Sequence, residues 1–449
     1  MNVALPEYAK LFFEPLERAG HAVYLVGGAV RDALQAVPCR DLDFATSATP
    51  RQVCDLFSSA KVGKEGISHG GVTVCLADGV SAEITTFRTE GAYSDGRHPD
   101  SVTFVKTLEE DLPRRDFTVC AMALSSDGEL IDPFGGREDL KCGVLRTVGD
   151  AHRRFAEDKL RVLRALRFCS EHGFVLEKTC RAAMQEQGAA LSQLPRPACF
   201  SEVCRLLCGK DAERVLVEER ELILAFLPEF EQTVGLDCDG SFQELDVYHH
   251  TARVVGRVEG KCEVRLAAFL HDLGKTQHSE QPGFGGHAAT SARMALAFLQ
   301  SFSAPRALAL RVAALVRASE GWPQDGVCGV QRLLLELGEE ELLQKLLMLK
   351  RANVSAKGPL GRELGEIRLL ALAEDVDAFF KEKEAFAPLT LPICKRDLLA
   401  FGVPDTEEVG DILQAVHACV VRGELKAERE TLLSAARKIF ETQNRCIPF

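Results

Sequence analysis

The hydrophobic pattern of the chain changes near residue 146. Before it, short apolar and β-branched runs such as residues 23–26, 70–75 and 82–88 alternate with turns rich in glycine, aspartate and proline, which is typical of strands mixed with helices. After it, leucines recur at helical spacing, for example at Leu160 and Leu163. We therefore predict an α+β N-terminal head, with a mixed sheet and helices, followed by an all-α neck, body and tail.

Composition and charge fit a protein of several globular domains. The chain has 449 residues, of which 46% are hydrophobic and 27% charged, and this length exceeds what one core accommodates. No apolar run has the length of a membrane span, and charges interrupt the N-terminal stretch, so we expect neither a membrane helix nor a signal peptide. The 16 cysteines are scattered without zinc-type spacing, which favours free thiols and a cytoplasmic location.

Two carboxylates follow the first expected strand and its glycine pair. Alternation along a second strand puts Asp41 and Asp43 on one face, where hard oxygen ligands suit Mg²⁺ shared with substrate phosphates. Gly27 and Gly28 lack side chains and let backbone N–H groups approach a triphosphate where a helix begins. Either feature alone is common in turns and at strand ends, but together they describe a two-metal nucleotidyl-transfer site. Glu83 is a candidate third carboxylate, although a solvated or ion-paired strand glutamate would give the same pattern.

Two segments carry a family resemblance. Residues 24–46, YLVGGAVRDALQAVPCRDLDFAT, resemble the head signature of the polymerase-β-like superfamily, specifically of the class II tRNA nucleotidyltransferases and bacterial poly(A) polymerases. Residues 114–123, RRDFTVCAMA, resemble a second motif of that family, and the apolar residues after the RRD triplet predict the start of a helix. The resemblance implies that Arg31, with the glycine pair, cradles phosphates, and that Asp116 and Arg115 contact the ribose 2′-OH and the triphosphate. A carboxylate that accepts a hydrogen bond from a 2′-OH can favour ribonucleotides.

Two further stretches resemble the family with small departures. HGGVTV at residues 69–74 is similar to the HGTVTV segment of CCA-adding enzymes, with Gly71 in place of Thr, and Cys120 stands where the second motif has Asn. The polar, turn-rich residues 89–100 correspond to a loop that, in the family, works as a lever in switching nucleotide choice and is missing from enzymes that add only C. Its presence favours an enzyme that can add A.

A charged pair in the expected neck matches the chemistry of two bases. Cytosine and adenine both present an exocyclic amino group beside an unprotonated ring nitrogen, which fits the carboxylate of Asp158 next to the guanidinium of Arg161 and excludes uracil and guanine. The segment resembles the EDxxR motif that serves the family as a protein template. Although the formal net charge is −12, basic residues cluster around this pair, and we assign Arg164 to the nucleotide and the others to RNA. The expected RNA-binding residues are Arg153, Arg154 and Arg167.

The expected body resembles an HD phosphohydrolase domain. His250, His271 and Asp272 are candidate metal ligands, with His287 as an accessory. The last part of the pattern departs, because Asn353, a neutral and poorer ligand, stands where the family has Asp. Both a metal-dependent phosphatase and a relict structural domain therefore remain open.

Taken together, the resemblance implies a CCA-adding tRNA nucleotidyltransferase that transfers CMP and AMP from CTP and ATP to the tRNA 3′ end without a nucleic-acid template, with Mg²⁺ as cofactor and pyrophosphate as product. A poly(A) polymerase or an A-adding enzyme is the nearest alternative, and an HD-domain phosphohydrolase is an alternative of another class. The partners implied are tRNA, CTP and ATP, with no membrane; the pattern favours no oligomeric state. The expected domains are a catalytic head at 1–146, a base- and RNA-binding neck at 147–235, an HD-like body at 236–380 and a tRNA-binding tail at 381–449.

Overall fold

A computed structural model of the chain divides it into two compact units, Met1–Glu231 and Gln232–Phe449, each of which is described by itself. The structure describes residues 3–39, 41–63, 66–77, 79–94, 96–97, 99–237, 245–280, 282–324, 326–385, 393–400, 408–421, 425–426 and 428–444.

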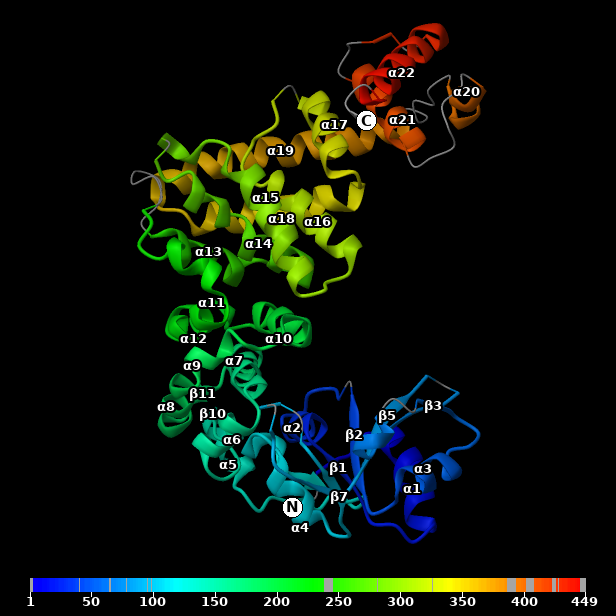
Figure 1. Cartoon of the computed structure of the whole chain (residues 1–449), viewed down its shortest axis with the longest axis vertical. Helices are drawn as coiled ribbons and strands as arrows, with labels where there is room; N and C mark the ends of the chain where they lie inside the picture. The colour runs from blue at the N-terminus through cyan, green and yellow to red at the C-terminus, as the bar shows by residue number, and fades with distance from the viewer. Residues whose placement is uncertain are drawn as a thin grey trace. The chain divides into compact units, whose positions relative to one another are not determined.

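The N-terminal unit contains a seven-stranded mixed sheet with the order β3-β4-β5-β2-β1-β8-β9 (Figure 1). The two central strands β2 and β5 run parallel, and all other neighbours in this sheet are antiparallel. A separate hairpin follows β5. The sheet consists of β1 Val23–Val26, β2 Leu42–Thr46, β3 Lys61–Gly63, β4 Gly71–Cys75, β5 Ser81–Thr86, β8 Ala123–Leu124 and β9 Leu130–Ile131, and the hairpin of β6 Arg88–Glu90 and β7 Val102–Phe104. This confirms the mixed sheet predicted for the head.

Helices cover the sheet through apolar faces. In α1 (Lys10–Arg18), Phe12 and Phe13 fall on one side, and their rings pack 5.5 and 5.0 Å from the ring of Phe44 in β2. Helix α3 (Pro50–Leu56) begins at Thr49, whose side chain accepts the N–H of Gln52 in a capping box. Helix α2 (Gly28–Leu34) follows β1 directly and contacts β1 and β2. The sheet and these helices hold the end of β2 in place.

One local prediction in the head was wrong. The apolar residues after the RRD triplet were expected to begin a helix, but Thr118–Cys120 form one 3₁₀ turn and Ala123–Leu124 form strand β8, which pairs with β1. Residues 121–124 are fully buried. Their burial in the sheet, where the backbone of β8 pairs with β1 on one side and β9 on the other, outweighs the helix propensity of an Ala-Met-Ala-Leu sequence.

After the sheet, the N-terminal unit becomes mainly helical. The helical structure that the leucine spacing predicts in this region is interrupted at Asp158, whose backbone is extended (φ −139°, ψ 105°) and whose carboxylate accepts the N–H of Leu160. Two short strands, which precede α6 and follow α7, pair with each other in parallel. Helix α4 (Leu108–Asp111) precedes β8. The elements after the sheet are α5 Gly136–Cys142, β10 Val144–Leu145, α6 Ala151–Glu157, α7 Leu160–His172, β11 Val175–Leu176, α8 Lys178–Glu186, α9 Gly188–Leu191, α10 Arg196–Cys208, α11 Ala212–Glu218 and α12 Arg220–Phe226.

Helices joined by loops make up the described part of the C-terminal unit. The last three helices share a small core of their own around Leu398, Ile412, Val416 and Leu432. The helices are α13 Val247–Arg257, α14 Cys262–Leu270, α15 His287–Ser301, α16 Arg306–Arg317, α17 Gly326–Leu337, α18 Glu340–Ala356, α19 Pro359–Ala385, α20 Lys395–Ala400, α21 Glu408–Val421 and α22 Arg429–Asn444. In the part of the chain that is described, no helix has both the length and the apolar character needed to cross a membrane.

Candidate active site

Three carboxylates gather at the start of two adjacent strands. Asp43 lies in β2, and the parallel register places it directly beside Glu83 of β5. Asp41 precedes the strand by one residue, and Leu42 between the two aspartates is 3% exposed, so the aspartates share the face away from the core as predicted. Burial, and then the nearby charge of Glu83, raise the pKa of Asp43 to about 6, because both disfavour the ionised carboxylate.

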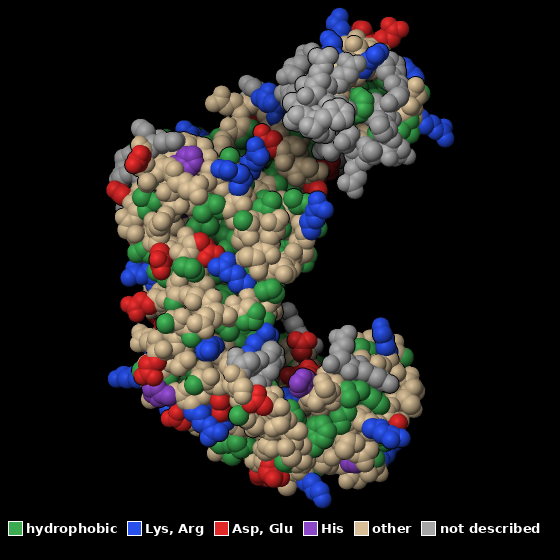
Figure 2. Space-filling view, in the orientation of Figure 1, with side chains coloured by type: hydrophobic (Ala, Val, Ile, Leu, Met, Phe, Trp, Pro, Cys, Tyr) green, Lys and Arg blue, Asp and Glu red, His purple; other side chains and the backbone are tan. Residues whose placement is uncertain are grey.

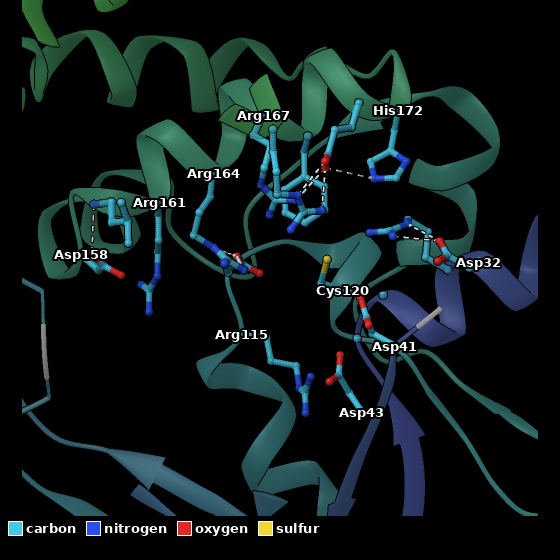
Figure 3. A pocket seen from close by; sticks show the side chains of 18 of the residues that line it. Asp32, Asp41, Asp43, Arg115, Cys120, Asp158, Arg161, Arg164, Arg167 and His172 are labelled. Atoms are coloured by element: carbon cyan, nitrogen blue, oxygen red, sulfur yellow. Dashed lines mark hydrogen bonds and ion pairs between the residues drawn. The ribbon is translucent and has the colours of Figure 1, made fainter. Parts of the chain in front are cut away.

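The glycine pair leaves room for this carboxylate. Gly27 has a φ of +67°, and a Cβ there would lie 3.2 Å from Asp43 Oδ2 and 3.7 Å from Arg115 Nη1. Both the backbone conformation and the space therefore require glycine at this position. Figure 3 shows Arg115 pointing toward Asp43 from the opposite side of the pocket.

The arginines near the carboxylates are held by other acidic residues. Asp111 is completely buried and accepts hydrogen bonds from Arg114 Nε at 3.0 Å and Arg115 Nη2 at 3.1 Å. The buried Nε of Arg115 has no hydrogen-bond partner in the described protein. On α2, Arg31 is 7% exposed, forms a 2.8 Å ion pair with Asp32 and lies 5.6 Å from the ring centre of Phe168. These arginines are thus fixed in position beside the carboxylates.

Asp116 forms a buried ion pair with the neck. Its Oδ2 accepts Nε of Arg164 at 2.8 Å and its Oδ1 accepts the N–H of Phe117 at 2.9 Å. Burial by itself would raise the pKa of Asp116, but the charges of Arg164 and Arg161 and the hydrogen bonds outweigh it, so its pKa lies below the usual range. Asp116 is therefore an acceptor that stays ionised, and α7 is tied to the head through it.

The predicted base-reading pair lies on either side of the break before α7. Asp158 is partly buried, and burial raises its pKa despite the nearby arginines. Arg161 is 6% exposed, and its Nη1 donates to Glu157 at 2.9 Å and to the carbonyl of Arg154 at 3.0 Å. The guanidinium of Arg161 also lies 5.6 Å from the ring centre of Tyr93, in the loop at residues 89–100. Arg161 is thus paired with Glu157 and not with Asp158.

A single cavity of about 880 Å³ joins these groups within the N-terminal unit. Figure 3 shows Arg161 and Arg164 reaching from α7 toward the side of the pocket that holds Asp41 and Asp43. Its lining carries ten Lys or Arg side chains and seven Asp or Glu side chains, a surplus that suits an anionic ligand. The predicted residues in the lining are Gly27, Gly28, Arg31, Asp41, Asp43, Arg115, Asp116, Asp158, Arg161, Arg164 and Arg167.

Three predicted residues lie outside the lining, and several lining residues were not predicted. Glu83 stands beside Asp43, whereas Arg153 and Arg154 bind Glu157, which lies four and three positions further along α6. Arg167 lies in the lining but is 3% exposed and bridges Glu202 and Glu171. The unpredicted lining residues include Tyr93, Arg97, His172, Arg205 and Lys210. They come from distant segments, and no local pattern in the sequence distinguishes them.

The C-terminal unit brings the second predicted cluster together. Ligand atoms of His250, His271 and Asp272 all lie within 4.8 Å of one another, and all three residues are buried. His287 approaches the other oxygen of Asp272 at 3.3 Å. Asn353 contacts His250 Nε2 through its Oδ1 at 3.1 Å, so it occupies the place of the missing aspartate.

Comparisons with known proteins find relatives of the N-terminal half of the chain. Residues 23–146 match the family model described as the poly A polymerase head domain. The chain is 47% identical to the CCA-adding enzyme of Anoxybacillus flavithermus over 219 residues, which are 48% of this chain and 54% of that protein. It is 49% identical to the CCA-adding enzyme of Lactobacillus delbrueckii subsp. bulgaricus over 201 residues, 45% of this chain and 50% of that protein. The chain thus spans about half the length of the curated relatives it matches.

The structural similarity extends further along the chain. A crystal structure of the Bacillus stearothermophilus CCA-adding enzyme in complex with CTP is similar with a TM-score of 0.63 and 28% identity. The match covers 98% of this chain and 98% of that protein. The fold of the helical part is therefore shared as well as that of the head.

Proposed function

We propose that this chain, which through its head and neck belongs to the class II tRNA nucleotidyltransferase and poly(A) polymerase family, is a CCA-adding enzyme. It would transfer CMP and AMP from CTP and ATP to the 3′ end of tRNA, in the cytoplasm, with release of pyrophosphate. The observation that carries the proposal is the single cavity that contains the aspartate pair, Asp116 and the base-reading pair. The relatives named above, all CCA-adding enzymes, support the same activity.

Asp41 and Asp43, with Glu83 as the candidate third ligand, would hold Mg²⁺. The donor set fits such an ion, since the carboxylates are hard oxygen ligands. Burial, and then the charge of Glu83, raise the pKa of Asp43, and a divalent cation would offset this cost to the ionised carboxylate. When bound, Mg²⁺ would help to ionise the attacking 3′-OH and neutralise the triphosphate. The protein itself would orient the 3′-OH and the triphosphate around the face of β2.

The phosphates and the ribose would be bound by groups already held in place. Gly27 and Gly28 give close access to the backbone, and Arg31 and Arg115 supply positive charge, with the unpartnered Nε of Arg115 available to a phosphate oxygen. Asp116 keeps lone pairs for the ribose 2′-OH, because each of its oxygens can accept more than one hydrogen bond. Arg164 would fix the orientation of that carboxylate.

The base would be read by Asp158 and Arg161. Glu157 occupies Nη1 of Arg161, which leaves Nε and part of Nη2 to donate to an unprotonated ring nitrogen. Asp158 would accept from the exocyclic amino group. The RNA contacts of Arg153, Arg154 and Arg167, and those of a tail at 381–449, remain predictions, as do the three boundaries between the four expected domains. Part of that tail lies outside the described residues.

The decisive test offers the protein three tRNA transcripts, ending before CCA, after C and after CC, with CTP, ATP or both. Addition of C, C and A that then stops is the expected result, resolved at single-nucleotide length. One A added only to the CC-ended transcript would make the protein an A-adding enzyme, and an unlimited A ladder would make it a poly(A) polymerase.

Asp41→Ala and Asp43→Ala should each abolish addition, and full turnover in either variant would contradict the metal assignment.

The cluster of His250, His271 and Asp272 supports a second, separate proposal: a divalent metal site in the body. The geometry favours it, because three ligand atoms lie within 4.8 Å. Equilibrium dialysis with Mn²⁺ or Zn²⁺ would test it, with His271→Ala as the variant that should lose one bound ion. An HD-type phosphohydrolase is disfavoured, since Asn353 lowers the negative charge of the ligand set.

A further inference from the structure

Helix α18 contains a buried lysine that neither the proposed active site nor the histidine cluster uses. Lys350 is 1% exposed. It lines a cavity of about 380 Å³ in the C-terminal unit, with walls from α18, α19, the start of α15 and the segment after α16. Helix α19 can approach α18 closely because residue 365 is glycine, where a Cβ would lie 2.7 Å from Val354. A buried amine thus borders a space that admits a small molecule.

The hydrogen bonds of Lys350 suit a neutral amine. Its Nζ donates to the backbone carbonyls of Ser319, at 2.9 Å, and of Gly321. A neutral amine has two N–H groups and a lone pair, so these two carbonyls satisfy both of its donors, whereas an ammonium has a third N–H. For that third donor the described residues offer only the ring of Trp322, whose centre lies 4.7 Å from Nζ, and no carboxylate ion pair. An uncharged Nζ therefore leaves no polar N–H unsatisfied.

Electrostatics favours the same form. Burial, and then the charge of Lys357, lower the pKa of Lys350 to about 7, although the charge of Glu320 acts in the opposite direction. Glu320 is 41% exposed, so solvent weakens its effect on Nζ. The other charged or titratable groups that line the cavity are His271, Asp272, Lys275, His287 and Arg368. About half of the molecules thus carry a free amine with a lone pair at neutral pH.

The charges around the cavity are unbalanced, because four Lys or Arg side chains and two acidic ones line it. We propose that Lys350 reacts with CO₂ to form a carbamate. The lone pair of Nζ attacks the carbon of CO₂, an N–C bond forms as one C–O π bond opens onto its oxygen, and Nζ releases one proton to water. No electron acceptor or donor is needed. Lys350 then carries a negative charge, so that three cationic and three anionic side chains line the cavity.

CO₂ suits this place better than a larger electrophile. Because Lys350 is almost completely buried, a reagent has to enter through the cavity, and CO₂ is a linear molecule of three atoms. It is also uncharged, so its entry carries no cost of desolvating an ion. The carbamate keeps one N–H for a backbone carbonyl, and Lys357 and Arg368 in the lining supply positive charge for its carboxylate. An acetyl group or a neutral imine would supply no negative charge.

The experiment compares two buried lysines of the same helix. Full-length protein in EDTA is equilibrated with ¹³C-labelled CO₂ at constant pressure, carbamates are trapped by alkylation with a trialkyloxonium salt, and peptides are located by mass spectrometry. Lys345 is the matched control: it is 7% exposed, but its Nζ pairs with Glu263 and, at 2.7 Å, with Glu341, and its pKa is raised. We expect at least about tenfold more label on Lys350, since a lysine with an ordinary or raised pKa is almost entirely protonated at neutral pH.

A variant and a second readout complete the test. Lys350→Arg keeps the positive charge and removes the nucleophile, so the label should disappear from α18. Trp322 is the only tryptophan of the chain, and its emission should change with CO₂ in wild type but not in Lys350→Arg. Asp41→Ala should be labelled like wild type, which separates this site from the proposed active site. Absence of label on Lys350 at a pH well above 7, or equal labelling of Lys345 and Lys350, would overturn the proposal.

Discussion

The carboxylate of Asp43 lies between Glu83 on the neighbouring strand and Arg115, with Gly27 at its back. The shared face of Asp41 and Asp43 and the nearby glycine pair could be predicted from the sequence, because alternation in a strand and a glycine pair are local patterns. Its raised pKa was not, since the pKa depends on burial and on Glu83, which lies 40 positions away along the chain. Without a metal ion, the ionised side chain therefore lowers the stability of the fold.

Asp43→Asn should stabilise the metal-free protein. The pKa of Asp43 in the folded state, about 6, lies above its unfolded value, so wild type loses stability as the pH rises from about 4 to about 6 and regains none above. Two pKa units correspond to roughly 2–3 kcal/mol, which the neutral amide would not lose. Calorimetry in EDTA should thus show a higher transition temperature for the variant above about pH 6, and no difference below about pH 4.

Added Mg²⁺ provides the control for that experiment. It should raise the transition temperature of wild type, because the ion binds the folded state through the carboxylates, and should have a much smaller effect on Asp43→Asn. A variant that is less stable than wild type at every pH would contradict the charge crowding inferred at this strand.

The elements around α7 show where sequence reasoning failed. The leucine spacing predicts helical structure after residue 146, but it does not predict that the chain breaks at Asp158, where that side chain caps the N–H of Leu160. The break separates Asp158 from Arg161, and the loop at residues 89–100 brings Tyr93 against the guanidinium of Arg161 over 68 positions of sequence. Contacts between residues so far apart in the sequence leave no local pattern. Asp158 and Arg161 could therefore be proposed from the sequence, whereas the contact of Tyr93 with Arg161 could not.

Tyr93→Leu should loosen base selection. The ring of Tyr93 and its hydroxyl hold the guanidinium of Arg161, and a cation–π contact of about 0.5–2 kcal/mol corresponds to about a two- to thirtyfold change. The measurement is the ratio of kcat/KM for CTP to that for UTP on a transcript ending before CCA. Tyr93→Phe keeps the ring and should retain most of the selectivity. An unchanged ratio in Tyr93→Leu would show that Glu157 alone positions Arg161.

The charge distribution is a property of the whole molecule. With a formal net charge of −12, the protein as a whole repels RNA, and Figure 2 shows acidic and basic side chains interspersed over the visible face of each unit. The sequence placed a basic cluster at residues 153–167, but the structure pairs most of it with Glu157, Glu171 or Glu202. Few cations of this cluster therefore remain exposed for a phosphate backbone, and each of these should have a measurable share in tRNA binding.

Arg153→Ala should weaken tRNA binding in a salt-dependent way. Arg153 is 80% exposed and can exchange its 3.0 Å ion pair with Glu157 for a phosphate at little cost. Losing one phosphate contact should lower the slope of log Kd against log salt by nearly one. Arg18→Ala is a close control, because Arg18 is also 80% exposed and pairs with Glu14 four positions away at 2.8 Å, but on α1 of the head. Equal slopes for wild type and Arg153→Ala would remove this residue from the RNA surface, whereas an equal loss in Arg18→Ala would mean that general charge, and not the neck, governs the affinity.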